Sequence, residues 1–286
     1  MNILIIISFV LLLLTSISLL IGIGNNMRYK LWYFLLSASI LTAYASHILN
    51  LTAILFTILT GLLAYYYRQK QKPWLAVLYV ILSYPLFFHT HFAGFHNYKF
   101  IDSLKITSEA VPYSLYFNFD KTLAGIFILG FLDFKIKKQN VRKLVEQYWK
   151  HMIVMFIVLS TMSYFLRYVH SDIKWPSFTP IWILVNLFFV CMAEEVLCRR
   201  VIQHQLASVL KIKYGNYIAI FISAVIFGLI HYQGGIKYIL LASLAGLFYG
   251  HIYDKTKEIR SSILLHFSLN IIHFLFFTYP VLFSSH

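Results

Sequence analysis

Charged side chains are scarce in this chain of 286 residues, because Asp, Glu, Lys and Arg together make up only 12% of it. A soluble globular domain contains about 25% charged residues, so a soluble fold of this length would lack polar surface. Hydrophobic residues make up 60% of the chain, which also excludes disordered and collagen-like classes. The composition therefore predicts a polytopic membrane protein.

Cysteine is nearly absent as well. Cys191 and Cys198 lie seven positions apart in one apolar segment with helical character. Two helical turns separate such residues by ~10 Å, which is too far for a disulfide. Neither has a second cysteine at the spacing of a metal site. We expect both to be small buried residues.

Apolar runs between polar breaks predict ten membrane-spanning helices, and hence an all-α polytopic transmembrane bundle. Basic residues alternate between the connections, with eighteen in one set of loops and six in the other. This bias predicts that the N and C termini both lie on the outer side of the membrane, and it explains the net charge of +14 without nucleic acid. The predicted spans are roughly residues 3–23, 31–47, 50–67, 74–92, 121–134, 149–168, 178–198, 215–231, 237–253 and 261–281.

A basic stretch over residues 134–150 divides the chain. Residues 1–147 form an N-terminal transmembrane region of unassigned role, and residues 148–286 form a C-terminal helical bundle. Residues 93–120 are a long connection on the predicted outer side, with several aromatic residues and mixed charge. We expect an ordered outer loop there, and a lid that gates substrate entry is the alternative.

Only ten acidic residues occur, and two of them, Glu194 and Glu195, directly follow the apolar run 181–193. A carboxylate at membrane depth costs about 2.5 kcal/mol or more, so it is a functional hypothesis by default. The alternative is that the helix ends here and both carboxylates reach interfacial water. Arg199 lies four positions after Glu195, and this spacing predicts an ion pair on one helix face. Glu194 points about 100° away and suits the role of a general base.

Three histidines lie in apolar contexts with defined neighbours. His231 closes the apolar run 221–230, with Phe227 one turn before it, and His266, Asn270 and His273 share one face of the last span. One Glu, two His and one Asn can activate a water and stabilise an oxyanion. Glu194, His231 and His266 can also hold zinc with a water as the fourth ligand. The pattern leaves both kinds of site open.

Three motifs carry these residues in order. They are Glu-Glu-x-x-x-Arg from Glu194 to Arg199, Phe-x-x-x-His from Phe227 to His231, and His-x-x-x-Asn from His266 to Asn270. On successive apolar helices, this set resembles the CAAX protease and bacteriocin-processing (Abi) family. The resemblance covers about residues 180–277.

The resemblance implies an all-helical intramembrane endopeptidase similar to the type II CAAX prenyl proteases. By analogy, Glu194 and His231 activate the water, His266 and Asn270 form the oxyanion hole, and Glu195, Arg199 and Phe227 support the site. It implies no obligatory metal, although a divalent ion would use Glu194, His231 and His266. The expected substrate is a prenylated, leader or other membrane-associated peptide, and the expected location is a bacterial-type plasma membrane. The lipid bilayer is the expected environment, and no nucleic acid is expected as a partner.

Motifs of the other intramembrane protease classes are missing, because the sequence contains neither His-Glu-x-x-His nor Gly-x-Ser nor Gly-x-Gly-Asp. The alternative from another class is a proton-coupled transporter or a non-catalytic membrane scaffold that uses the same Glu and His residues.

The expected helix limits place the motif residues at different depths in the membrane, although they would have to meet in one site. They place Glu194 and His266 in the inner half of the membrane and His231 near the outer end of its span. Two solutions remain open. Either the helix of Glu194 continues to about Leu210, or the span that ends at His231 stops at depth, where Gly234 and Gly235 permit a break.

Overall fold

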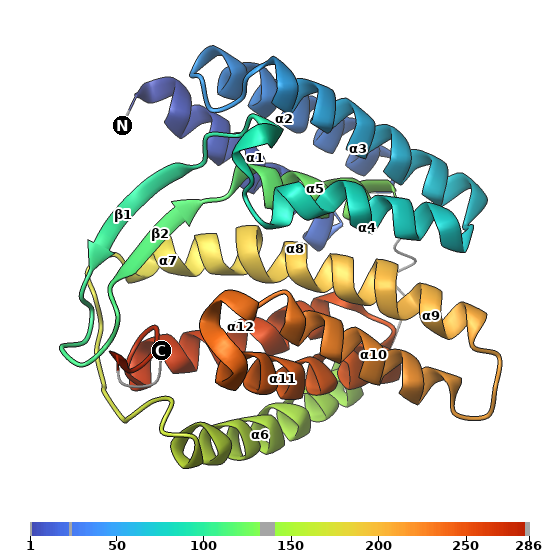
Figure 1. Ribbon diagram of the computed structural model, residues 1–286. Helices are drawn as coiled ribbons and strands as arrows, with labels where there is room; N and C mark the ends of the chain where they lie inside the picture. Colours follow the sequence, from blue (N-terminus) through green and yellow to red (C-terminus); the bar gives the residue numbers. More distant parts are fainter. Residues whose placement is uncertain (1, 23–24, 132–140, 284–286) are drawn as a thin grey trace. The chain divides into compact units, whose positions relative to one another are not determined.

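The computed structural model describes residues 2–22, 25–131 and 141–283, and these residues are mostly helical (Figure 1). Within this part, five helices are long and apolar enough to cross a membrane, which supports an integral membrane protein. The count of ten spans and the outward termini stay predictions. The first part of the basic stretch, residues 134–140, lies outside the described residues. The five candidate spans are Ile3–Ile21, Leu51–Lys70, Thr179–Val209, Tyr232–Thr256 and Ile259–Phe276.

Two compact units interleave along the chain, while the division at residue 147 stays a prediction. The first unit comprises Met1–Phe100, Tyr116–Lys135 and Phe188–Leu197, and the second comprises Ile101–Leu115, Ile136–Leu187 and Cys198–His286. The first contains helices α1 (Ile3–Ile21), α2 (Asn25–Ala45), α3 (Leu51–Lys70), α4 (Pro73–Phe87), α5 (Phe119–Phe131) and α8 (Met192–Glu195). The second contains α6 (Val141–Phe165), α7 (Thr179–Val185), α9 (His204–Val209), α10 (Gly215–Leu229), α11 (Gly235–Thr256) and α12 (Ile259–Phe276).

Helix α5 is the centre of the first unit. Every one of its 13 residues is buried, and it packs against α1, α3, α4 and α8. Local signals set the starts of its neighbours: the Asn50 side chain accepts a hydrogen bond from the Ala53 amide at the start of α3, and Pro73 is the first residue of α4. From Leu123 to Phe131 its sequence is apolar without interruption, and such a sequence has no polar face to expose.

The helix that contains Glu194 is continuous from Thr179 to Val209. It consists of α7, the π-helix η2 (Asn186–Cys191), α8, the π-helix η3 (Val196–Gln203) and α9. The sequence left open whether this helix ends near Glu194 or continues to about Leu210, and the longer helix is the one observed. Helix α10 meanwhile stops at Leu229, before His231, and Gly235 has a φ of 79° at the start of α11. The longer helix of Glu194 is therefore observed, whereas an end of α10 within the membrane stays a prediction.

The second unit packs α6, α10, α11 and α12 together, and α10 lies along α11 (Figure 1). Small residues allow the close approach of α10 and α11. A Cβ atom added at Gly228 would lie 2.5 Å from the Ile239 carbonyl oxygen, and one at Gly246 would lie 3.1 Å from Ala224 Cα. Cys191 and Cys198 are both buried and form no disulfide, as predicted.

A β-hairpin corrects the strictly all-α expectation. Strands β1 (Tyr98–Leu104) and β2 (Tyr113–Phe117) pair within the connection that was expected to be a loop. Residues 113–117 are rich in aromatic side chains, which favour strands. In the structure Leu115 and Phe117 are buried while Tyr116 between them is exposed, the alternation of a strand with one buried face. The role of this segment as a lid stays a prediction.

Candidate functional site

His231 lies in the turn after α10, where its ring is fixed by its own motif. Its Nδ1 atom lies 2.7 Å from the carbonyl oxygen of Phe227, so in the neutral ring Nδ1 carries the hydrogen and donates it. Nε2 is then the basic nitrogen. The ring centroids of Phe227 and His231 are 4.8 Å apart. The four-residue spacing of the motif therefore sets both the orientation and the tautomer of this histidine.

His266, from the third motif, contacts the same phenylalanine. Its ring centroid lies 5.5 Å from that of Phe227 in an edge-to-face arrangement, and it stacks on Tyr249 of α11 at 4.7 Å. His266 is buried, with 5% of its surface exposed. The second and third motifs therefore meet at Phe227, which was predicted only as a supporting residue.

Asn270 lies one turn after His266, and its side chain is held by a residue that the sequence reasoning missed. The amide nitrogen Nδ2 of Asn270 donates to Oδ1 of Asn186 at 3.1 Å. Asn186 begins the π-helix η2 and is buried. Its signal was available, because it is a polar residue within the apolar run before Glu194, and polar residues at membrane depth mark functional sites by default.

A cavity of about 110 Å³ lies within the second unit, beside these motif residues. Its volume exceeds the ~30 Å³ that one water molecule occupies in the liquid, so there is room for water and for a small reacting group. Most of the lining is apolar and comes from α6, α11 and α12. The polar side chains in the lining include His231, His266, Asn270 and His273, together with Ser160 and Ser163 of α6.

Arg199 is fully buried and anchors its helix to α10. Its Nη1 atom donates to Oγ of Ser223 at 3.1 Å, and its guanidinium lies over the Phe227 ring, 5.5 Å from the centroid. Gln203, one turn later, donates to the carbonyl of Gly250 in α11 at 2.9 Å. These contacts are of the kind that a supporting residue makes, whereas the ion pair of Arg199 with Glu195 stays a prediction.

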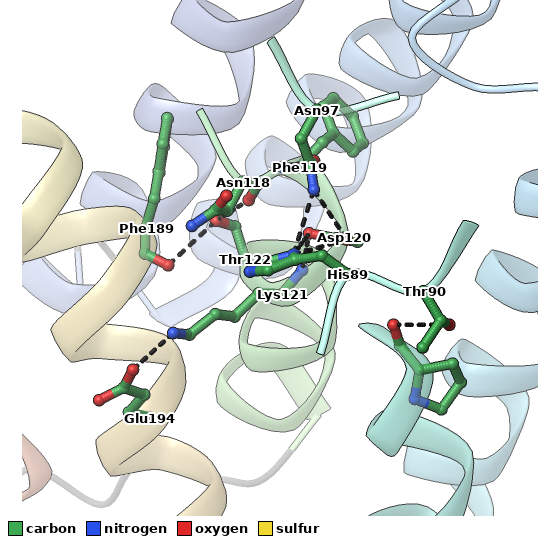
Figure 2. A network of polar contacts seen from close by, with 11 residues as sticks. His89, Thr90, Asn97, Asn118, Phe119, Asp120, Lys121, Thr122, Phe189 and Glu194 are labelled. Atoms are coloured by element: carbon green, nitrogen blue, oxygen red, sulfur yellow. Dashed lines mark hydrogen bonds and ion pairs between the residues drawn. The ribbon is translucent and has the colours of Figure 1, made fainter. Parts of the chain in front are cut away.

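Glu194 is buried in the first unit and has a cationic partner there (Figure 2). Nζ of Lys121, in the first turn of α5, lies 2.5 Å from Oε1 of Glu194. Helix spacing offers Glu194 no partner within its own helix, and the partner observed belongs to another helix. Such a partner could not be predicted from spacing, because Lys121 is 73 positions away.

No group of three or more His, Cys, Asp or Glu side chains within residues 2–22, 25–131 and 141–283 is arranged to hold a metal ion. Independence of a metal cofactor stays a prediction.

Comparison with known proteins adds one match. Residues 175–272 match the family model described as type II CAAX prenyl endopeptidase, Rce1-like. Comparisons of the chain with curated proteins and with solved structures found no match. The matched segment contains all three motifs and about a third of the chain. It confirms the resemblance found in the sequence: residues 175–272 carry the pattern of the Rce1-like CAAX prenyl endopeptidases.

Proposed function

We propose that the protein is an intramembrane endopeptidase that hydrolyses a peptide bond in a membrane-associated substrate. The observation that supports this most directly is the meeting of His231 and His266 at Phe227, beside a cavity that Asn270 also lines. The family match of residues 175–272 supports the same activity. The candidate membrane spans support a reaction in or at a bilayer.

The proposed chemistry begins with the activation of a water molecule. Glu194 accepts a proton from the water, and Nε2 of His231 accepts the water's second hydrogen in a hydrogen bond, which orients the oxygen for attack on the carbonyl carbon. The attack moves the carbonyl electron pair onto the oxygen and forms a tetrahedral oxyanion. Glu194 then returns the proton to the leaving nitrogen as the C–N bond breaks, so the products are a carboxylic acid, which keeps the second hydrogen of the water, and an amine; at neutral pH they ionise to a carboxylate and an ammonium group.

His266 and Asn270 stabilise the oxyanion in this proposal. Donors that are held in place before the reaction lower the barrier most, because they need no reorganisation. Asn270 is held by Asn186, and an amide nitrogen carries two hydrogens, so one can be used for this anchor and the other for the oxyanion. His266 is held between Phe227 and Tyr249.

The assignment of Glu194 to this chemistry follows from its motif and its helix. Asn186, eight positions before it, bonds to Asn270, and Arg199, five positions after it, packs on Phe227. The residues on either side of the acidic pair thus each contact a residue of another motif, and this supports the role proposed for Glu194.

The apolar lining of the cavity suits a substrate with a lipid or hydrophobic side chain near the scissile bond. Prenylated C-terminal peptides and apolar leader peptides both meet this description. We propose a plasma membrane of bacterial type as the location.

Comparative peptidomics tests the proposal. Membranes that contain the wild-type protein are compared with membranes that contain Glu194→Ala, and the expected result is a set of cleavage products that disappears in the variant while the protein stays folded. Glu195→Gln is the matched control, since we expect it to lower stability or expression more than the catalytic rate. Unchanged products with Glu194→Ala would exclude the endopeptidase and favour a non-catalytic scaffold. Loss of activity in folded Glu195→Gln alone would reverse the two roles.

A further inference from the structure

Three side chains fix the N-terminus of α5 (Figure 2). Asp120 is 1% exposed, and its carboxylate contacts Nδ1 of His89 at 2.9 Å and accepts a hydrogen bond from Nδ2 of Asn97 at 2.8 Å. Asp120 also accepts from the backbone amide of Lys121 at 2.7 Å, and Oδ1 of Asn97 accepts from the amide of Phe119 at 2.8 Å. These bonds satisfy amides that a helix start leaves without partners, so the backbone at Lys121 is held in place.

The same helix approaches the acidic segment closely along its next turn. A Cβ atom added at Gly125 would lie 2.8 Å from Ala193 Cα, so α5 and the segment of Glu194 touch through their backbones. The Thr122 hydroxyl lies 3.4 Å from the carbonyl oxygen of Phe189 on that segment. This spacing lets the side chain of Lys121 reach the carboxylate of Glu194.

Both charges of this ion pair are buried. Lys121 is 8% exposed and Glu194 is 4% exposed, and the Lys121 ammonium also lies 5.7 Å from the ring centroid of Phe87. Removal of one charge from a buried pair leaves the other without compensation, which costs stability unless the remaining group becomes neutral, whereas neutral replacement of both is often tolerated. A buried carboxylate that loses its cation tends to take up a proton, and a protonated carboxyl cannot act as a base.

We propose that Lys121 is a positioning residue for Glu194, which keeps this carboxylate ionised and directed for its role as a base. The inference rests on the proposed function for its effect on catalysis, and it gives the N-terminal half of the chain a part in the reaction. His89, Asn97 and Asp120 support Lys121 through the backbone of α5. The motif region alone, residues 175–272, therefore lacks one part of the working site.

The test compares four variants of the full chain in lipid nanodiscs. Lys121→Met removes the charge at similar size, Lys121→Arg keeps it, and the double variant Lys121→Met with Glu194→Gln neutralises both partners. Lys105→Met is the matched control, because Lys105 is an exposed lysine just after β1. The two readouts are the kinetic constants for a peptide substrate from the peptidomics and the infrared absorption of protonated carboxyl groups at neutral pH.

We expect Lys121→Met to lower kcat by about 10² with little change in KM, which is the lower end of what general base catalysis contributes. We expect the same variant to gain a carboxylic-acid C=O band that the double variant lacks. Lys121→Arg should restore most of the activity, and Lys105→Met should match the wild type.

An unaltered kcat and no new infrared band in folded Lys121→Met would overturn the proposal. If Lys121→Met fails to fold, the double variant decides the question: recovery of folding supports an uncompensated Glu194 charge, and continued misfolding refutes it. The infrared readout does not require activity. If no variant, including the wild type, cleaves any peptide, the proposed function fails while the effect of Lys121 on Glu194 is still measured.

Discussion

Gly228 provides the most quantitative test of how the fold positions the motif residues. It lies between Phe227 and His231, at the point where α10 touches α11. A Cβ atom there would lie 1.9 Å from Oγ of Ser243 and 2.5 Å from the backbone oxygen of Ile239. Ser243 can change its rotamer, but the backbone oxygen cannot, so the helices must separate by roughly half an ångström before even a 3.0 Å contact is reached.

Gly228→Ala should therefore destabilise the protein by about 1–3 kcal/mol, the usual cost of overpacking. For a chain of this size class that corresponds to a fall in Tm of roughly 2–12 °C. Gly246→Ala is the matched control at the same helix pair, where the new Cβ would lie 3.1 Å from Ala224 Cα and the cost should be smaller. The gain in helix propensity from Gly to Ala is common to both variants and cancels in the comparison.

Thermal unfolding of both variants in detergent, followed by tryptophan fluorescence, measures the difference. Peptidase activity should fall further with Gly228→Ala than with Gly246→Ala, because the displaced turn carries Phe227 and His231. Equal Tm values for the two variants, or a higher Tm for Gly228→Ala, would refute the packing argument.

Two further predictions concern named hydrogen bonds. Asn186→Leu removes the anchor of Asn270 and should lower kcat with little effect on KM, by less than the 10²–10³ that loss of an oxyanion donor costs; an unchanged kcat would show that Asn270 needs no anchor. Burial raises the pKa of Asp172, but its hydrogen bond from Thr107 and the nearby Lys174 outweigh this and hold the pKa below the usual value. Its contribution to stability is thus present above the ordinary carboxyl pKa and lost as the pH falls through the lowered one, so the Tm of Asp172→Asn should fall less in acid than that of the wild type.

Much of the site was predictable from the chain because its motifs are local. Phe227 and His231 are four residues apart, as are His266 and Asn270, and residues at this spacing lie close together along an α-helix. The apolar context of each motif then indicated that it lies within a bundle. The second and third motifs do meet in the structure, at the ring of Phe227.

The contacts that the sequence did not reveal join residues far apart in the chain. Lys121 reaches Glu194 across 73 positions, and Asn186 reaches Asn270 across 84. No helical period connects such residues. A lysine at the start of a short apolar segment is interpreted as a loop residue, because basic residues concentrate in the connections between membrane spans. Its burial depends on the packing of α5 inside its unit, which is a property of tertiary structure.

The helix of the acidic pair shows why local spacing has limits even within one element. The predicted pair of Glu195 and Arg199 assumed α-helical geometry, in which residues four apart share a face. In the structure the segment after Glu195 is the π-helix η3, and another π-helix, η2, precedes Met192. Hydrogen bonds in a π-helix join residues five apart, so each π segment rotates the following side chains relative to an α-helix. Such segments are frequent at functional sites, and here one lies on each side of the two carboxylates. The direction of the Glu194 side chain relative to α7 therefore differs from the one that an uninterrupted α-helix would give.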